Sequence, residues 1–105
     1  MNQRLAFRMQ LKPGMEAEYR RRHDALWPEL GDLLRESGIH DYWIFLDRET
    51  NALFATLLLR EDNNREALPH HPVMRRWWDH MADIMEVNPD NSPREWSLAP
   101  MFHFA

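Results

Sequence analysis

Apolar and polar residues alternate along the first part of the chain. Residues 4–12, RLAFRMQLK, place four apolar side chains on one face with polar ones between them. The apolar positions are Leu5, Phe7, Met9 and Leu11. Strict alternation of this kind predicts a β-strand that is buried on one face. The dipeptide PG at 13–14 then predicts a turn.

The apolar spacing becomes helical from Met15 to about Ser37. Six side chains fall on one stripe at about 100° per residue; they are Met15, Tyr19, Leu26, Leu30, Leu33 and Leu34. Pro28 stands inside this stretch and cannot donate a hydrogen bond to the carbonyl of Asp24. The helix therefore either kinks at Pro28 or ends there and restarts with the proline in a new first turn. Gly38 is suited to end it.

Two strands follow, at residues 39–47 (IHDYWIFLD) and 52–60 (ALFATLLLR). Both are apolar on both faces, which predicts that both faces of their sheet are covered. The polar segment 61–67 then predicts a short helix or a loop.

One proline marks the start of the second helix and another interrupts the last strand. Pro72 suits a helical first turn, and the apolar spacing extends this helix from residue 71 to about residue 86. Residues 88–93, NPDNSP, are rich in turn formers. The segment 97–105, SLAPMFHFA, predicts a strand, and its Pro100 indicates a sheet edge or a bulge.

The order β-α-β-β-α-β is that of the split, ferredoxin-like α+β fold. The 105 residues fit a single domain, 1–105. Two helices can cover only one face of a four-stranded sheet. Because the middle strands are apolar on both faces, the uncovered face needs a partner, most simply a second copy of the chain. We therefore predict a homodimer whose two sheets pack against each other.

Composition and charge exclude several classes of protein. The chain has no cysteine, which excludes disulfides, thiolate metal sites and cysteine nucleophiles. Its net charge is −4, which argues against a general nucleic-acid binder. The N-terminal stretch MNQRLAFRMQLKPG carries no long apolar run, so we expect neither a signal peptide nor a membrane span. A cytoplasmic protein is the resulting expectation.

The spacing of Tyr19, His23 and Trp27 indicates a first candidate site. Successive members are four residues apart, so they are neighbours along a helix. Tyr19 lies within the apolar stripe, whereas His23 lies roughly 60° from its centre. That position suits an acid or base that lines a pocket, and it also suits a solvated histidine at the core boundary. Trp27 points away from the stripe, and we expect it to pack.

The segment 75–81, RRWWDHM, contains a second candidate. Adjacent helical residues point about 100° apart, so one of Trp77 and Trp78 can be core while the other faces a cavity. Aromatic rings pack against the apolar C–H face of a pyranose, while polar side chains bind its hydroxyls. The alternative is plain core packing, with an ion pair between Arg75 and Asp79 on the solvated side.

The strand segment HDYW, residues 40–43, gives a third candidate. Strand alternation puts His40 and Tyr42 on one face. A tyrosine hydroxyl that points under the helices can meet His23, or Tyr42 can be an ordinary strand aromatic. No further ligand stands at metal spacing from His23 or His40, so we expect no metal site.

Together these stretches resemble the L-rhamnose mutarotase family. The matching segments, in the order and spacing of the family, are EYRRRHDALWPEL (18–30), GIHDYWIFLD (38–47), RRWWDHMADIM (75–85) and NPDNSP (88–93). The first segment is shared more loosely by other ferredoxin-like dimeric barrels, whereas the RWW and NPDNSP pieces are more specific. The departures lie in ALFATLLLR, EDNNREALPHH and REWSLAP, and they concern the pocket rim and the tolerance for related sugars.

The resemblance implies a dimeric α+β barrel and an isomerase, a 1-epimerase that interconverts the α and β anomers of L-rhamnose. Carried over position by position, the proton donor of the family falls on His23. Its sugar-binding residues fall on Tyr19, Tyr42, Trp77 and Trp78. Mutarotation moves protons and no hydride, so no cofactor is expected.

The hypothesis from the sequence is that His23 protonates the ring oxygen. A second proton-transfer group is needed, and Tyr42, His40 or a bound water fits that role. Two other classes stay open. Dimeric-barrel monooxygenases, some of them haem-degrading, also place a helical histidine and a tryptophan in a cavity, and a non-catalytic sugar-binding module is the other alternative.

Overall fold

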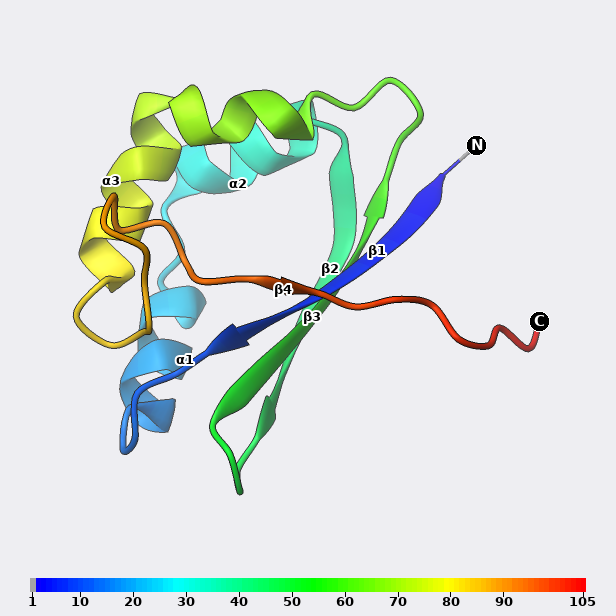
Figure 1. Cartoon of the computed structure of the whole chain (residues 1–105). Helices are drawn as coiled ribbons and strands as arrows, with labels where there is room; N and C mark the ends of the chain where they lie inside the picture. The colour runs from blue at the N-terminus through cyan, green and yellow to red at the C-terminus, as the bar shows by residue number, and fades with distance from the viewer. Residues whose placement is uncertain (1) are drawn as a thin grey trace.

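The chain forms a four-stranded antiparallel sheet with its α-helices on one side (Figure 1). The computed structural model describes residues 2–105. Its elements, in chain order, are β1 (Gln3–Gln10), α1 (Glu16–Asp24), α2 (Pro28–Glu36), β2 (Ile39–Asp47), β3 (Ala52–Leu59), the 3₁₀ helix η1 (Arg65–His70), α3 (Pro72–Met81) and β4 (Trp96–Ser97). The strands lie in the order β2-β3-β1-β4, and each neighbouring pair is antiparallel. The predicted ferredoxin-like α+β fold is therefore confirmed.

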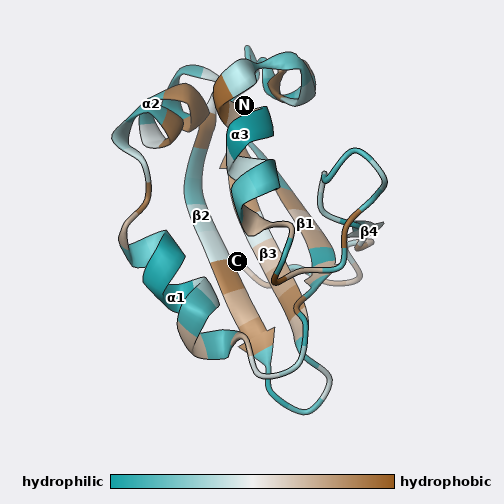
Figure 2. Ribbon diagram, turned by 90° about the vertical axis from the view of Figure 1, so that its left-hand side faces the viewer, coloured by the Kyte–Doolittle hydropathy of each residue, from teal (hydrophilic) through white to brown (hydrophobic). Residues whose placement is uncertain are grey.

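The core lies between the sheet and the helices α2 and α3. The buried side chains of the strands alternate with exposed ones, as expected for a sheet covered on one face. The core is formed mainly by Phe7, Met9, Leu11, Leu30, Leu53, Leu57, Trp77 and Met81. The helix α1 differs from the others because none of its residues is fully buried. Figure 2 shows the same contrast, with α1 almost entirely hydrophilic and α2 carrying a hydrophobic side.

The proline in the first helical stretch divides that stretch into two helices. The helix α1 ends at Asp24, and Pro28 is the first residue of α2. Trp27, just before the proline, has an extended backbone with φ −62° and ψ 128°. A residue before proline favours this extended conformation, because the proline ring clashes with the backbone of a preceding residue that is helical. Of the two predicted outcomes, the structure has the second, an end and a restart.

The second helix is shorter than predicted, because α3 ends at Met81 and not near Glu86. Beyond Met81 the backbone binds to the end of β1. The N–H of Lys12 donates to the carbonyl of Ile84 (2.9 Å), and the N–H of Glu86 donates to the carbonyl of Gln10 (2.9 Å). Ile84 is buried. The apolar residues that lengthened the predicted helix are thus buried in a non-helical segment beside the sheet.

The predicted strand 97–105 is wrong beyond its first residue, since β4 contains only Trp96–Ser97. The N–H of Leu98 still donates to the carbonyl of Ala6 (3.2 Å), and no strand follows. Pro100 has no N–H with which to continue such a ladder. The end of the chain instead extends away from the sheet (Figure 1). Its large apolar side chains are almost fully exposed: Met101, Phe102 and Phe104.

A β-bulge overturns the predicted face of His40. The register of β2 shifts after His40, and Asp41 has a φ of +48°. The extra residue leaves Tyr42 on the face that the helices cover. His40 pairs with Leu58 on the other face, where its Nε2 lies 3.3 Å from Nδ2 of Asn2. His40 and Tyr42 therefore do not share a face, and His40 cannot serve a site under the helices.

The face of the sheet away from the helices carries exposed aromatic rings. Trp43 is 56% exposed and Phe45 is 55% exposed, and their rings stack with centroids 5.6 Å apart. Phe54 lies opposite Phe45 on β3 and is also exposed. Within residues 2–105, no helix is both long and apolar enough to cross a membrane.

Candidate functional site

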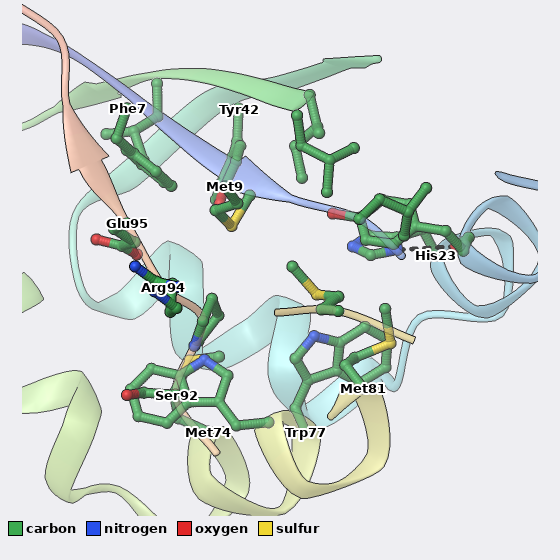
Figure 3. A pocket seen from close by; sticks show the side chains of 18 of the residues that line it. Phe7, Met9, His23, Tyr42, Met74, Trp77, Met81, Ser92, Arg94 and Glu95 are labelled. Carbon is green, nitrogen blue, oxygen red and sulfur yellow. Dashed lines mark hydrogen bonds between the residues drawn. The ribbon is translucent and has the colours of Figure 1, made fainter. Parts of the chain in front are cut away.

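The helices and the covered face of the sheet surround an open cavity of about 1350 Å³. Side chains from α1, α3, β1, β2 and the segment before β4 line it (Figure 3). All five residues that the sequence assigned to a site contribute to this lining: Tyr19, His23, Tyr42, Trp77 and Trp78. Residues that are up to 59 positions apart in the chain therefore meet at one cavity.

The ring of His23 is oriented by its own helix. Its Nδ1 lies 3.0 Å from the backbone carbonyl oxygen of Tyr19, one turn earlier in α1. A carbonyl oxygen only accepts, so Nδ1 donates and carries a hydrogen. In the neutral ring, Nε2 is then an acceptor without a hydrogen. The imidazole also stacks on the ring of Tyr19, with centroids 4.3 Å apart.

Burial favours the neutral form of His23. Desolvation lowers the pKa of the imidazole below its ordinary value. The hydrogen bond to Tyr19 and the charge of Asp24 act in the opposite direction but do not compensate. At neutral pH the ring is therefore uncharged and presents a basic nitrogen.

The two tyrosines keep their protons. Desolvation raises the pKa of Tyr19 and of Tyr42 well above the ordinary value for a phenol, and the nearby charge of Glu95 adds to the effect on Tyr42. Both hydroxyls therefore remain available as hydrogen-bond donors. The Tyr42 ring meets Phe7 of β1 edge to face, with centroids 6.4 Å apart. This contact holds Tyr42 against the floor of the cavity.

The two tryptophans of α3 combine the two roles that the sequence left open. Trp77 belongs to the buried core and also lines the cavity, where it meets His23 edge to face with centroids 5.4 Å apart. Trp78 is half-buried and lines the cavity as well. Trp27 packs edge to face on Trp77 (5.1 Å), as expected from its direction. The alternative ion pair at the solvated side of α3 does not form, since Asp79 accepts from Asn91.

Sequence reasoning missed the charged side chains at the other end of the cavity. Glu95 precedes β4 and Arg65 begins η1, and both line the cavity. Desolvation raises the pKa of the Glu95 carboxyl, and the charge of Arg65 lowers it in part. Isolated charges in loops have no periodicity, so the only signal was that Glu95 lies in REWSLAP, where the chain departs from the family pattern.

Within the described residues 2–105, no three His, Asp or Glu side chains come together in a group that could hold a metal ion. The side chains that line the cavity offer chemistry of their own. A neutral imidazole can accept a proton, tyrosine hydroxyls can donate hydrogen bonds, and indole rings can pack on an apolar face. The fold and cavity define a small α+β protein whose aromatic pocket contains a histidine and two tyrosines, an arrangement suited to a sugar.

Comparison with known proteins identifies the family. The family model described as L-rhamnose mutarotase matches residues 4–104. The L-rhamnose mutarotase of Brucella anthropi is 60% identical over 101 residues, which are 96% of this chain and 95% of that protein. The one of Rhizobium etli is 62% identical over 98 residues, which are 93% of this chain and 92% of that protein. The crystal structure of L-rhamnose mutarotase from Formosa agariphila superposes with a TM-score of 0.91 at 47% identity, covering 98% of this chain and 99% of that one.

The chain belongs to the L-rhamnose mutarotase family. The resemblance noted in the sequence is confirmed, together with the isomerase class that it implied. The comparisons favour this family over the dimeric-barrel monooxygenases and over a sugar-binding module without activity.

Proposed function

We propose that this protein interconverts the α and β anomers of L-rhamnose by opening and closing the pyranose ring, as part of rhamnose metabolism. Its membership in the family supports the reaction and the substrate. The observation that carries the mechanism is the hydrogen bond from Nδ1 of His23 to the carbonyl of Tyr19, because it leaves Nε2 as a free base.

Ring opening breaks the bond between C1 and the ring oxygen O5, removes the proton of the anomeric hydroxyl O1 and adds a proton to O5. Both oxygens are bonded to C1, so one imidazole nitrogen beside C1 can exchange a proton with O1 and with O5. In the proposed sequence, Nε2 of His23 takes the O1 proton as the C1–O1 double bond forms, and gives that proton to O5. The role of proton donor that the resemblance implied is thus the second half of a transfer that begins with a neutral base.

Ring closure reverses these steps on the other face of C1. After rotation about the C1–C2 bond, O5 attacks C1 and returns its proton to His23. The carbonyl oxygen O1 regains a proton from His23, directly or relayed by the hydroxyl of Tyr42. His40 is excluded as the second carrier because it lies on the other face of the sheet. No hydride or electron leaves the sugar, so the reaction needs no cofactor.

The aromatic residues hold the open sugar in place during this rotation. The indoles of Trp77 and Trp78 pack against its carbon skeleton, and the hydroxyls of Tyr19 and Tyr42 bind its oxygens. All four side chains line the same cavity as His23. Retention of the aldehyde matters because rotation about C1–C2 must finish before the ring closes.

Replacement of His23 tests this mechanism. Saturation-transfer NMR on the anomeric protons measures exchange between the two forms of L-rhamnose. His23→Ala and His23→Asn are expected to lower the protein-dependent rate by about 10²- to 10⁴-fold. His70→Ala is the matched control, since His70 is exposed and does not line the cavity. Exchange at the unmodified rate in both His23 variants contradicts the proposed role.

We also propose that the protein acts as a homodimer in the cytoplasm. The exposed ring pair of Trp43 and Phe45, and the exposed apolar end of the chain, support a partner on the open face of the sheet. Sedimentation equilibrium over a wide concentration range tests the dimer, and Trp43→Glu is expected to shift it towards the monomer. A strictly monomeric mass for the unmodified protein rules the dimer out.

A further inference from the structure

A carboxylate and a guanidinium lie at the opposite end of the cavity from His23. Glu95 belongs to the segment before β4, and Arg65 is the first residue of η1. Both line the cavity that contains His23, Tyr42 and the tryptophans. Figure 3 shows Glu95 far from His23, with Tyr42 and Met9 between them. A ligand that reaches from His23 across the cavity therefore meets Glu95 at its other end.

Neither side chain has a hydrogen-bonding or ion-pair partner among residues 2–105. Within residues 2–105, Arg65 forms no side-chain hydrogen bond or ion pair, and its guanidinium lies over the ring of Phe7, 5.6 Å from the ring centroid. The Glu95 carboxyl likewise forms none in this part of the chain. Two other carboxylates that line the cavity have partners, Glu16 in Arg48 and Asp90 in Ser92, whereas Asp24 and Glu66, which also line it, have none among residues 2–105.

The two charges are nevertheless close enough to act on each other and on the sugar-binding wall. The charge of Arg65 lowers the pKa of Glu95 against the effect of desolvation, and both charges act on Tyr42. The Glu95 side chain lines the cavity and belongs to an exposed residue, so its carboxyl oxygens are accessible to a ligand. Its unused acceptors point to a ligand rich in hydroxyls.

The donors and acceptors match the hydroxyls of a monosaccharide. A carboxylate accepts at two oxygens, so it can bind two neighbouring hydroxyls, and a guanidinium donates in a fixed plane. Hydrogen bonds to charged groups are stronger than those between neutral groups. In a six-membered sugar ring C4 is opposite C1, with C3 beside it. When C1 lies at His23, the C3 and C4 hydroxyls face the far end of the cavity.

We propose that Glu95 and Arg65 bind the hydroxyls on C3 and C4 of the sugar and thereby set which monosaccharides the cavity accepts. This inference rests on the proposed function, because it uses the position of C1 at His23. Glu95 is a binding residue in this account and takes no part in proton transfer at C1. Its loss weakens the binding of the sugar and so raises KM.

The affinity for methyl α-L-rhamnopyranoside tests the inference. This glycoside cannot open its ring, so calorimetry or NMR titration measures binding without turnover. Glu95→Ala and Arg65→Ala are each expected to weaken binding about 10- to 100-fold, as for a hydrogen bond to a charged group. Glu95→Gln keeps the shape and is expected to lose less. The matched controls are Glu36→Gln and Arg76→Ala, which change exposed residues outside the cavity.

The 4-deoxy glycoside shows whether the carboxylate acts on the assigned end of the sugar. The unmodified protein is expected to bind it about 10-fold or more weakly than the parent, whereas Glu95→Ala binds both nearly equally. Circular dichroism establishes that each variant is folded, and Glu95→Gln serves if Glu95→Ala is not. The inference is overturned if both Glu95 variants bind the parent within about threefold of the unmodified protein. It is overturned equally if Glu95→Ala still loses the full factor on the 4-deoxy compound.

These outcomes are separate from a failure of the proposed function. If the unmodified protein does not speed anomer exchange, the mutarotase proposal fails whatever the glycoside titrations give. If exchange is fast and depends on His23 but both Glu95 variants bind like the unmodified protein, only the inference about Glu95 and Arg65 fails.

Discussion

The indole of Trp77 meets the imidazole of His23 edge to face, with ring centroids 5.4 Å apart and planes at 89°. Trp77 comes from α3 and His23 from α1, so this contact joins the proposed base to the hydrophobic core. On its other side the imidazole stacks on Tyr19. The position of the proposed proton carrier thus depends on a core residue from a distant part of the chain.

Trp77→Ala is therefore expected to damage both stability and activity. Trp77 is only 6% exposed, so its truncation costs about 3 to 5 kcal/mol of unfolding free energy. Trp78→Ala is the matched control on the same helix, and its half-buried side chain predicts a smaller loss of stability. Urea denaturation, monitored by fluorescence, measures the unfolding free energy of both variants. An equal loss for the two variants contradicts the core role of Trp77.

The acid limb of the activity profile is expected to lie below the ordinary histidine pKa of about 6.5. Desolvation lowers the pKa of His23, so the neutral, active ring persists to a lower pH. The rate constant of exchange, corrected for the reaction without protein, gives this profile. An inflection clearly above 6.5 contradicts the prediction.

The same shift affects stability with a defined sign. Between the lowered folded pKa and about 6.5, the unfolded chain binds a proton at His23 that the folded chain does not. His23 therefore contributes a loss of stability as the pH falls through this window. His23→Gln removes that contribution, so the stability difference between the unmodified protein and the variant should change within the window and be constant above it.

Arg22 is the member of the arginine run that holds α1 in place. Its side chain is 12% exposed, and it donates to Glu18, to Asp83 and to the carbonyl of His80. Arg22→Ala is expected to lower the unfolding free energy by about 1 to 2 kcal/mol, since the carboxylate partners are partly screened by solvent.

The neighbouring arginine provides the control for that prediction. Arg21 binds only Glu18 among residues 2–105, and its side chain is 67% exposed. Arg21→Ala should leave the urea midpoint almost unchanged. Equal shifts for Arg21→Ala and Arg22→Ala contradict the assignment of Arg22 as the tie between α1 and the end of α3.

Two glycines with positive φ differ in the space around them. Gly38 has φ +89° and Gly14 has φ +79°, so alanine at either position adopts a strained left-handed backbone, at a cost of about 1 to 3 kcal/mol. At Gly38 an added Cβ also lies 2.8 Å from Cβ of Asn63, whereas at Gly14 it meets nothing within 4 Å. Gly38→Ala is therefore expected to destabilise more than Gly14→Ala in thermal unfolding. The reverse order contradicts the crowding at Gly38.

The sequence pattern correctly predicted the helices and strands whose bounds depend on residues nearby in the sequence. The bounds predicted for β2, 39–47, coincide with those in the structure, and the alternation around Phe7 and Met9 identified β1. The restart at Pro28 follows from the missing N–H and was one of two predicted outcomes. These features depend on backbone sterics and on the period of burial, which a single sequence displays.

The errors arose where distant segments meet. The bulge at Asp41 places His40 on the other face of the sheet. Residues 84–86 form hydrogen bonds with the end of β1, and α3 does not extend into them. The length of β4 also depends on a distant segment, because β4 pairs with β1 only at Phe7 and Arg8. In the site, spacing and resemblance selected five residues that share one cavity, while Glu95 was missed because its only signal was its place in a segment that departs from the family pattern.

The helix that carries His23 contributes no fully buried residue to the core. It is held by polar ties such as Arg22 with Asp83 and Glu16 with Arg48, and by the aromatic contact with Trp77. Among the proposed site residues, Trp77 therefore belongs to the buried core, whereas His23 lies on a helix that is held mainly at the surface. Substitutions at exposed positions of α1 can therefore alter the surroundings of the proposed proton carrier in the course of evolution without repacking the interior, and the same positions offer an accessible route for engineering.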